Sequence, residues 1–494
     1  MNSLVLPIVI PLLTAAILLL APRQPRLQRW ISFLGSLGMA ASAVFLFIHV
    51  QHEGIIVLQA GGWPAPFGIT LVADLLASML LVATGIVGVA VTGSSFAGVD
   101  PLREAFGYHG LLQVLLMGVS GAFLTGDLFN LYVWFEVMLV ASFVLMAVHR
   151  TRAQIEGAFK YVTLNLISSS FFLTAIGLLY GGTGTLNMAD LAATFQQREM
   201  GAFELVLAML LFTAFGVKAA LFPLFFWLPA SYHTPPAAIG AVFAGLLTKV
   251  GVYALIRVFT LLFQNAPPML YNMLLVQAGL TMIVGLIGAL AQRDFRRVLS
   301  FNLVGHLGYT TVGLALMTQT AMAASILYIF HHILVITNLY LISGIFLRLR
   351  RTTEFSALGS IFRDYPVVAA ISMIPLFSLA GVPPLSGFAG KLALIRATVD
   401  AGAWWTSGII LGVGVLTIIS MTRLWDESFW KPAPQPDKTS MSRVMLVPIA
   451  GLAAITLVLS FAAGPFFELS LRASRQLLDP QIYMNAVLNG GQGR

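Results

Sequence analysis

Apolar runs of about 20 residues recur along the whole chain, separated by short segments in which charged and turn-forming residues gather. A helix of that length crosses a hydrocarbon layer roughly 30 Å thick. Because no interruption is wide enough for a separate soluble domain, we expect one all-α polytopic membrane protein. The pattern predicts about fourteen transmembrane helices, over residues 3–21, 29–50, 70–94, 109–125, 128–149, 159–180, 202–228, 236–259, 269–291, 298–318, 321–347, 365–399, 403–424 and 442–463.

Composition narrows the class of protein further. Of the 494 residues, 58% are hydrophobic and only 9% are charged, and the mean hydropathy is +0.90. The chain has no cysteine, which excludes disulfides, thiolate metal sites and iron–sulfur ligation. It also lacks a glycine-rich phosphate-binding loop followed by lysine and a hydroxyl residue, so an ATP-driven pump is not expected. We therefore expect a membrane protein that is not an enzyme and that binds neither cofactor nor metal.

The basic residues are concentrated in alternate loops, which indicates an orientation. The first run has no basic residue before it and no cleavage site after it, so we expect it to remain as a helix. If the N-terminus faces outward, the inner loops hold 18 of the 27 basic residues: Arg23, Arg26, Arg29, Arg103, Arg150, Arg152, Lys160, Arg293, Arg296, Arg297, Arg348, Arg350, Arg351, Arg363, Arg423, Lys431, Lys438 and Arg443. The positive-inside rule then predicts that both termini lie outside. The net charge of +8 thus reflects topology and contact with membrane lipids, and no nucleic acid partner is expected.

Charged residues inside the apolar runs are the first candidates for function. Lys218 and Lys249 lie too far from the ends of their predicted helices for the ammonium to reach the headgroups without strain, and Glu136 is too short to do so. A charge at the bilayer centre costs on the order of 3 kcal/mol even on the most lenient scale. Each of these residues therefore needs a partner or water, and we expect all three to be functional. We expect Glu136 and Lys218 to interact as a pair, because each is costly alone.

Proline-rich interruptions occur close to two of the buried lysines. Pro223 and Pro229 follow Lys218, and the segment GVPPLSG (381–387) precedes Lys391. Discontinuous helices in the two halves of a chain are typical of transport sites built from repeats. The alternative is a simple kink, which is common in membrane helices.

Histidines supply groups that can pass a proton near neutral pH. His331 and His332 are adjacent within one predicted helix, and at least one of them is expected to face the interior. Neighbouring helical residues point about 100° apart, so the two cannot bind one metal ion as an i, i+4 pair would. His306, one helix earlier, is either a relay or a hydrogen-bonded core residue. Serines such as Ser169 are more often contacts between helices than pathway residues.

Several motifs resemble a known family. WLPASYHTPPAAIGAVFAGLLTKVGVY (227–253), with Lys218 ahead of it, is similar to the proton-conducting antiporter module of respiratory complex I, membrane hydrogenases and Mrp-type cation/proton antiporters. The resemblance covers almost the whole chain. The stretches VWFEVMLVASFVLMA (133–147), LPIVIPLLTA (6–15) and FHHILVITN (330–338) look most like the D subunits of Mrp antiporters.

This resemblance implies a fold with two inverted five-helix repeats in which helices 7 and 12 are broken. It places the N-terminal helices 1 to 4 at residues 1–126, with helix 4 opening the first repeat. The rest of that repeat follows at 127–260, the second repeat at 261–425, and the last helix with a periplasmic tail at 426–494. The proton-translocating residues that it implies are Glu136, Lys218, Lys249, His331 or His332 as the bridging histidine, and Lys391. Where relatives often carry a lysine after the histidines, this chain has Ile336, so the route between Lys249 and Lys391 depends more on His332, hydroxyls and water.

The function implied is that of a proton-translocating subunit in a multisubunit Na+/H+ antiporter of the bacterial plasma (inner) membrane, with other subunits, protons and Na+ as partners. One alternative is a proton-pumping subunit of complex I or of a membrane hydrogenase. The other is a structural scaffold subunit whose charges only hold helices together. The sequence leaves open whether the cation passes through this chain.

Overall fold

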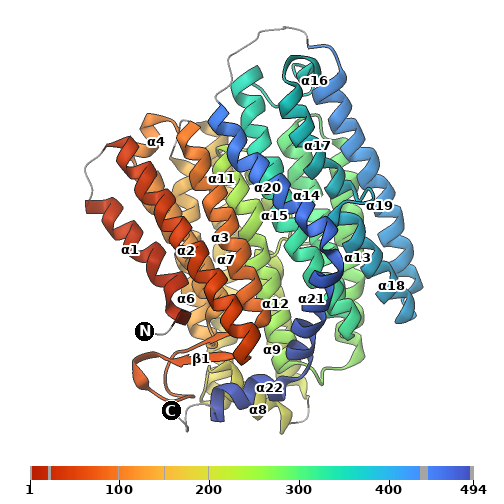
Figure 1. Cartoon of the computed structure of the whole chain (residues 1–494). Helices are drawn as coiled ribbons and strands as arrows, with labels where there is room; N and C mark the ends of the chain where they lie inside the picture. Colours follow the sequence, from red (N-terminus) through yellow and green to blue (C-terminus); the bar gives the residue numbers. More distant parts are fainter. Residues whose placement is uncertain are drawn as a thin grey trace.

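The computed structural model describes residues 3–20, 24–97, 99–148, 151–198, 200–433 and 443–489. Arg23, Arg150 and Lys438, which contributed to the predicted orientation, lie outside these ranges. The described chain is a bundle of helices (Figure 1), and ten of them are long and apolar enough to cross a membrane. The prediction of an all-helical, multi-pass membrane protein is therefore confirmed.

Every predicted apolar run has a helical counterpart. The first half contains α1 (Leu6–Leu20), α2 (Pro25–Glu53), α3 (Leu75–Ser94), α4 (Pro101–Ala105), α5 (Tyr108–Leu124), α6 (Leu128–Ala147), α7 (Arg152–Thr183), α8 (Met188–Gln196), α9 (Ala202–Lys218), α10 (Trp227–Ser231), α11 (Ala237–Val242) and α12 (Thr248–Leu262). The second half contains α13 (Pro268–Ala291), α14 (Phe295–Leu316), α15 (Gln319–Arg350), α16 (Ile361–Asp364), α17 (Pro366–Ala380), α18 (Ser386–Asp400), α19 (Trp404–Trp425), α20 (Leu446–Phe461), α21 (Ala463–Leu478) and α22 (Pro480–Met484). Short 3-10 turns are η1 (Ser3–Val5), η2 (Ala60–Gly62), η3 (Ser95–Ala97) and η6 (Arg443–Met445), and π-helical turns are η4 (Phe243–Leu247), η5 (Asp426–Trp430) and η7 (Asn485–Asn489).

One predicted helix begins later than its apolar run suggests. Residues 70–73 form a strand, β2 (Thr70–Ala73), which pairs antiparallel with β1 (Ile56–Gln59), so that Ile56 lies opposite Ala73. The helix α3 begins only after Asp74, whose carboxylate accepts the backbone N–H of Ala77. A short apolar run does not distinguish a buried strand from the first turn of a helix, which explains the difference.

The bundle has two distinct ends. The β1–β2 hairpin, α8 and α22 lie together at the lower end in Figure 1, which we call the hairpin end, whereas α4 and α16 lie at the opposite end. The first and last described turns, η1 and η7, both contact β1, and the Gln59 amide donates to the carbonyl of Val487 at 3.4 Å. The two ends of the described chain therefore lie on the same side of the bundle.

A matching backbone feature occurs once at each end. At the hairpin end, the start of α6 bonds to the loop after α7, through Leu128 N to Leu186 O at 3.0 Å and Met188 N to Gly126 O at 2.8 Å. At the opposite end, the start of α14 bonds to the loop after α15, through Phe295 N to Thr353 O and Phe355 N to Arg293 O. In both places an aspartate, Asp127 or Asp294, caps the helix by accepting a backbone N–H.

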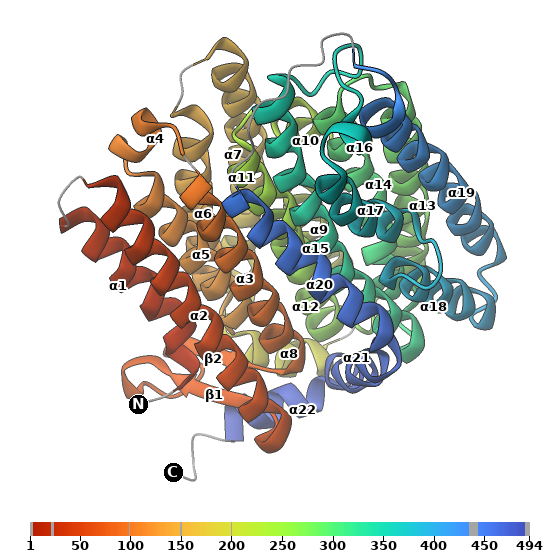
Figure 2. The ribbon, with the colours of Figure 1, turned by 45° about the horizontal axis from the view of Figure 1, so that its top comes forward.

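The helix α15 occupies the centre of the bundle (Figure 2). It contacts helices from both halves of the chain, namely α3, α11, α14, α17, α18, α20 and α21. The most apolar stretch of α15 is completely buried. This position brings the histidines of α15 between the lysines of α12 and α18.

Candidate functional site

The first cluster joins Glu136 to Lys218 through a hydroxyl group. Ser169 on α7 donates to Glu136 Oε1 at 2.5 Å, and the Lys218 ammonium donates to the same hydroxyl oxygen at 3.2 Å. The ammonium also lies 4.8 Å from the centre of the Phe135 ring, a cation–π contact. The predicted proximity of the two charges is thus mediated by Ser169, a residue that does not stand out in the sequence.

Lys218 is the last residue of α9, where the helix is interrupted. The chain reverses through Ala220, whose φ is 53°, before it resumes in α10. The freed Val217 carbonyl accepts both the Ala220 N–H at 3.0 Å and the Trp227 indole N–H at 2.9 Å. A proline-containing break is tolerated in a membrane when neighbouring groups satisfy the backbone in this way.

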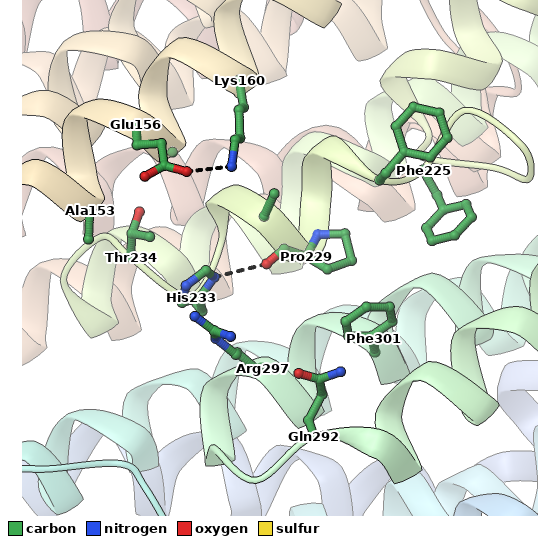
Figure 3. A pocket seen from close by; sticks show the side chains of 13 residues that line it. Ala153, Glu156, Lys160, Phe225, Pro229, His233, Thr234, Gln292, Arg297 and Phe301 are labelled. Carbon is green, nitrogen blue, oxygen red and sulfur yellow. Dashed lines mark hydrogen bonds and ion pairs between the residues drawn. The ribbon is translucent and has the colours of Figure 1, made fainter.

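Two cavities lie on either side of α10. The larger, of about 450 Å³, is lined by Glu156 and Lys160 of α7, the segment after the break, and Arg297 (Figure 3). The smaller, of about 20 Å³, is lined by Lys218, Trp227 and Tyr232 among others, and it has room for about one water molecule. The short helix α10 therefore lies between the larger cavity, which we call the vestibule, and the Lys218 ammonium.

The vestibule carries charges of both signs. Lys160 and Glu156 form an ion pair at 2.6 Å, and His233 Nδ1 bonds to the carbonyl of Pro229 at 2.9 Å. Burial lowers the pKa of His233, and the neighbouring Arg297 guanidinium lowers that pKa further. His233 is thus neutral at pH 7 beside this pocket.

Lys249 lies at the start of α12, directly after the π-helical turn η4. Its ammonium donates to the Ala244 carbonyl at 2.5 Å, and the residue is only 1% exposed. A π-helical turn displaces the usual backbone pairing, and such turns are frequent at functional sites. Gly245 within η4 lets Thr337 of α15 approach, because a Cβ there would lie 2.3 Å from the Thr337 hydroxyl. The close approach of η4 to α15 at Gly245 therefore holds the start of α12, which carries Lys249, against the central helix.

Aromatic and imidazole rings of α14 and α15 pack on one another. The His332 ring stacks on His306 with centroids 5.1 Å apart and on Tyr328 with centroids 6.2 Å apart. His306 Nδ1 is hydrogen-bonded to the Tyr328 hydroxyl, and the Tyr328 ring packs against His331 at 5.4 Å. Several buried nitrogens in this group have no protein partner within the described ranges, namely His306 Nε2, His331 Nε2 and both ring nitrogens of His332.

This series of ring and hydroxyl contacts, which we call the row, ends at the break between α17 and α18. His331 Nδ1 is hydrogen-bonded to the Ser386 hydroxyl at 2.8 Å, and Ser386 contacts Ser378 at 2.9 Å. Lys391, one turn further along α18, donates to the carbonyls of Leu379 and Ala380 at 3.1 and 2.8 Å. These carbonyls lie at the C-terminal end of α17, where the helix leaves them without their usual partners.

The structure gathers five of the six predicted site residues into two groups. Glu136 and Lys218 form one, and His332, His331 and Lys391 form the other, around the rings of Tyr328 and Tyr309. Within the described residues, the hydrogen bond of the Lys249 ammonium is to the Ala244 carbonyl and not to a member of either group. Sequence reasoning missed Tyr328, although it lies three and four residues before the two histidines and so on their face of α15. Ile336 is buried, and its side chain offers no polar atom.

Comparisons with known proteins agree with this arrangement. Residues 125–417 match the family described as NADH:quinone oxidoreductase/Mrp antiporter, transmembrane. The D subunit of the Na(+)/H(+) antiporter from Alkalihalophilus pseudofirmus is 43% identical over 99% of this chain and 99% of its own length. Among solved structures, a chain of the Mrp complex from Dietzia sp. DQ12-45-1b superposes with a TM-score of 0.93 at 28% identity, covering 98% of this chain and 99% of its own.

A chain of the membrane-bound sulfane sulfur reductase, an archaeal respiratory membrane complex, superposes with a TM-score of 0.90 at 27% identity, over 99% of this chain and 100% of its own. The fold is thus common to antiporter and respiratory complexes, whereas the higher identity lies with the antiporter D subunits. The chain belongs to the NADH:quinone oxidoreductase/Mrp antiporter membrane family, in the branch of the Mrp antiporter D subunits.

Proposed function

We propose that this chain is the proton-translocating subunit of a multisubunit Na+/H+ antiporter and that protons move along Glu136, Lys218, Lys249, His332, His331 and Lys391. The observation that carries this proposal is the second group of residues, in which rings and hydroxyls connect His332 through His306 and Tyr328 to His331 and Ser386, with Lys391 against the Tyr309 ring. A lysine that has lost its proton accepts one from a charged neighbour, and imidazoles pass protons between such sites. Water molecules bound to the unpartnered imidazole nitrogens would complete the steps that the side chains do not span.

Cation exchange requires that charge at one point of the row alters proton affinity at the next. A carboxylate close to a buried lysine favours its charged form, and burial disfavours it. Any movement of Glu136 away from Ser169 and Lys218 therefore changes the proton affinity of Lys218. A membrane potential of 100 mV supplies about 2.3 kcal/mol per charge moved, which is comparable to the effect of such rearrangements.

We further propose fourteen membrane crossings arranged as two inverted repeats, with the boundaries 1–126, 127–260, 261–425 and 426–494. The matching backbone feature at the starts of α6 and α14, found at opposite ends of the bundle, supports this inversion. The breaks after Lys218 and before Lys391 occupy equivalent places as helices 7 and 12. The hairpin end, which holds both ends of the described chain, then faces outward.

Two experiments separate this function from its alternatives. In assembled complexes, Lys249→Ala should abolish cation/proton exchange in membrane vesicles, while Lys160→Ala, which removes an exposed lysine of the vestibule, should leave the complex assembled and exchange measurable. If the chain were only a scaffold, Lys249→Ala would instead disturb assembly. Identifying the subunits that purify with the chain distinguishes an antiporter from a respiratory complex, because only the latter brings a redox arm.

A further inference from the structure

A second set of buried charges lies at the hairpin end of α12. Arg257 forms an ion pair with Asp74, the residue that caps α3, and both are almost completely buried. Arg257 Nε donates to the Tyr253 hydroxyl at 3.3 Å, and that hydroxyl donates to the Phe123 carbonyl at 2.8 Å. The set therefore connects α3, α5 and α12, and each of its three titratable side chains has a partner.

The C-terminal helices cover this ion pair. The guanidinium lies 5.2 Å from the centre of the Tyr483 ring on α22, as well as 5.3 Å from the Tyr253 ring. On α21, Gln476 accepts the N–H of Leu75, next to Asp74, at 3.0 Å. Gly126 makes room for Tyr483, because a Cβ there would lie 2.9 Å from its hydroxyl oxygen.

The Asp74–Arg257 ion pair involves the same helix, α12, that carries Lys249. Lys249, Tyr253 and Arg257 follow at intervals of four along one face of α12. Arg257 lies about 12 Å further along the helix axis than Lys249, toward the hairpin end. Tyr253 is the one polar side chain of α12 between Lys249 and Arg257, so Tyr253 and Arg257 are the groups that this helix offers to a proton in this direction.

We propose that Asp74 and Arg257 form an insulating plug that prevents protons from passing between Lys249 and the outer surface along α12. The proposal rests on the function proposed above. An arginine guanidinium does not release its proton in a protein, so it cannot relay one. By occupying the Asp74 carboxylate and donating to the Tyr253 hydroxyl, Arg257 also removes the two groups that otherwise continue the route.

The proposal is tested by measuring how fast protons leak across the membrane when no cation is available for exchange. Vesicles holding the assembled complex are given a pH gradient in the absence of Na+ and K+, and the decay of the gradient is followed with a pH-sensitive dye. Arg257→Gln should speed the decay about tenfold, because it frees a titratable carboxylate and changes the charge about 12 Å from Lys249 by one unit, worth about 1.4 kcal/mol at an effective dielectric constant of 20. Arg257→Lys, which keeps a cation beside Asp74, should leak less than Arg257→Gln.

The double variant Asp74→Asn with Arg257→Gln distinguishes a plug from a merely structural ion pair. It has neither the carboxylate nor the guanidinium of the plug, so we expect it to leak less than Arg257→Gln alone, whereas general loosening would make it leak at least as much. Arg29→Gln breaks a comparable ion pair, with Glu104, at the opposite end and should leave the vesicles tight. If Arg257→Gln does not assemble, Tyr483→Ala exposes the same pair and should give an intermediate leak.

Tight vesicles with both Arg257→Gln and Tyr483→Ala, or equal leaks from the single and double variants, would overturn the plug. Failure of the proposed function gives a different result, in which Lys249→Ala still exchanges cations for protons.

Discussion

At the scale of single residues, the side-chain hydrogen bonds of the candidate site are made through hydroxyl groups rather than by direct ion pairs. Ser169 lies between Glu136 and Lys218, the Tyr328 hydroxyl contacts His306, and Ser386 contacts His331. A hydroxyl both donates and accepts, so it can serve a charged and a neutral neighbour in turn. This property suits a site at which the neighbours change protonation state.

The bridging role of the hydroxyl groups can be tested most directly at Ser169. Ser169→Ala should lower the exchange rate about tenfold, because a hydrogen bond to a charged group contributes about 1.5–3 kcal/mol and here one oxygen serves two charges. The measurement is cation-driven proton movement in vesicles with equal amounts of assembled complex. Ser170→Ala is the matched control, since the Ser170 hydroxyl is exposed and bonds to the Leu166 carbonyl of its own helix; equal rates in both variants would contradict the bridging role.

Tyr328 gives a second test, on the central helix. Tyr328→Phe keeps the ring that packs against both histidines and removes only the hydroxyl, so exchange should fall about fivefold for a lost hydrogen bond of about 1 kcal/mol. Tyr340→Phe on the same helix is the control, because the buried Tyr340 hydroxyl has no hydrogen-bond partner in the described ranges. A normal rate for Tyr328→Phe would show that protons bypass this hydroxyl.

The charged members of the site could be predicted from sequence because a buried charge is conspicuous in an apolar run. For that reason, the sequence alone was enough to select Glu136, Lys218 and Lys249 as candidates. Ser169 and Tyr328 could not be predicted in the same way. Serine and tyrosine are common in membrane helices, and only the packing of α6, α7 and α9, or of α14 and α15, shows which hydroxyls meet a charge.

At the scale of secondary-structure elements, the break in α9 depends on a glycine in the neighbouring helix. A Cβ at Gly251 on α12 would lie 2.5 Å from Ala219 N and 2.8 Å from the Lys218 carbonyl carbon. The contact is with backbone, which cannot rotate away as a side chain can. The Lys218 break and the Lys249 helix are therefore fitted to each other at this point.

We expect Gly251→Ala to destabilise the protein by about 1–3 kcal/mol through overpacking and to displace Lys218. Thermal unfolding of the purified protein should show a lower midpoint than the wild type. Gly177→Ala, in α7, is the control because a Cβ there meets no atom within 4 Å, and removing a helical glycine should stabilise by roughly 0.5–1 kcal/mol. A midpoint for Gly251→Ala at or above that of the wild type would argue against the tight fit.

The elements themselves differ in how far sequence predicts them. Long apolar runs predicted a helix for each span, because a membrane leaves helices as the usual spanning structure. The hairpin strand Thr70–Ala73 and the π turn Phe243–Leu247 were missed. Both lie inside apolar runs, where strand, α-helix and π-helix have the same composition and only the surrounding contacts decide among them.

At the scale of the whole molecule, the orientation of the two ends can be tested without background labelling, because the chain has no cysteine. Trp63 at the hairpin and Phe362 on α16 are both exposed, at 67% and 53%. In intact cells an impermeant maleimide should label Trp63→Cys from outside, and Phe362→Cys only after the membrane is opened. The reverse pattern would invert the proposed topology.

The central position of α15 also has a consequence for the insertion of the nascent chain into the membrane. Synthesis proceeds from the N-terminus, so α18 and α20 leave the ribosome after α15. Until they arrive, His331 lacks Ser386, and Asn338 lacks the Ile449 carbonyl that it bonds at 3.1 Å. Unsatisfied polar groups are costly in lipid. We therefore expect the nascent chain to depend most on insertion chaperones, and to be most open to membrane proteases, after α15 and before α20 is inserted.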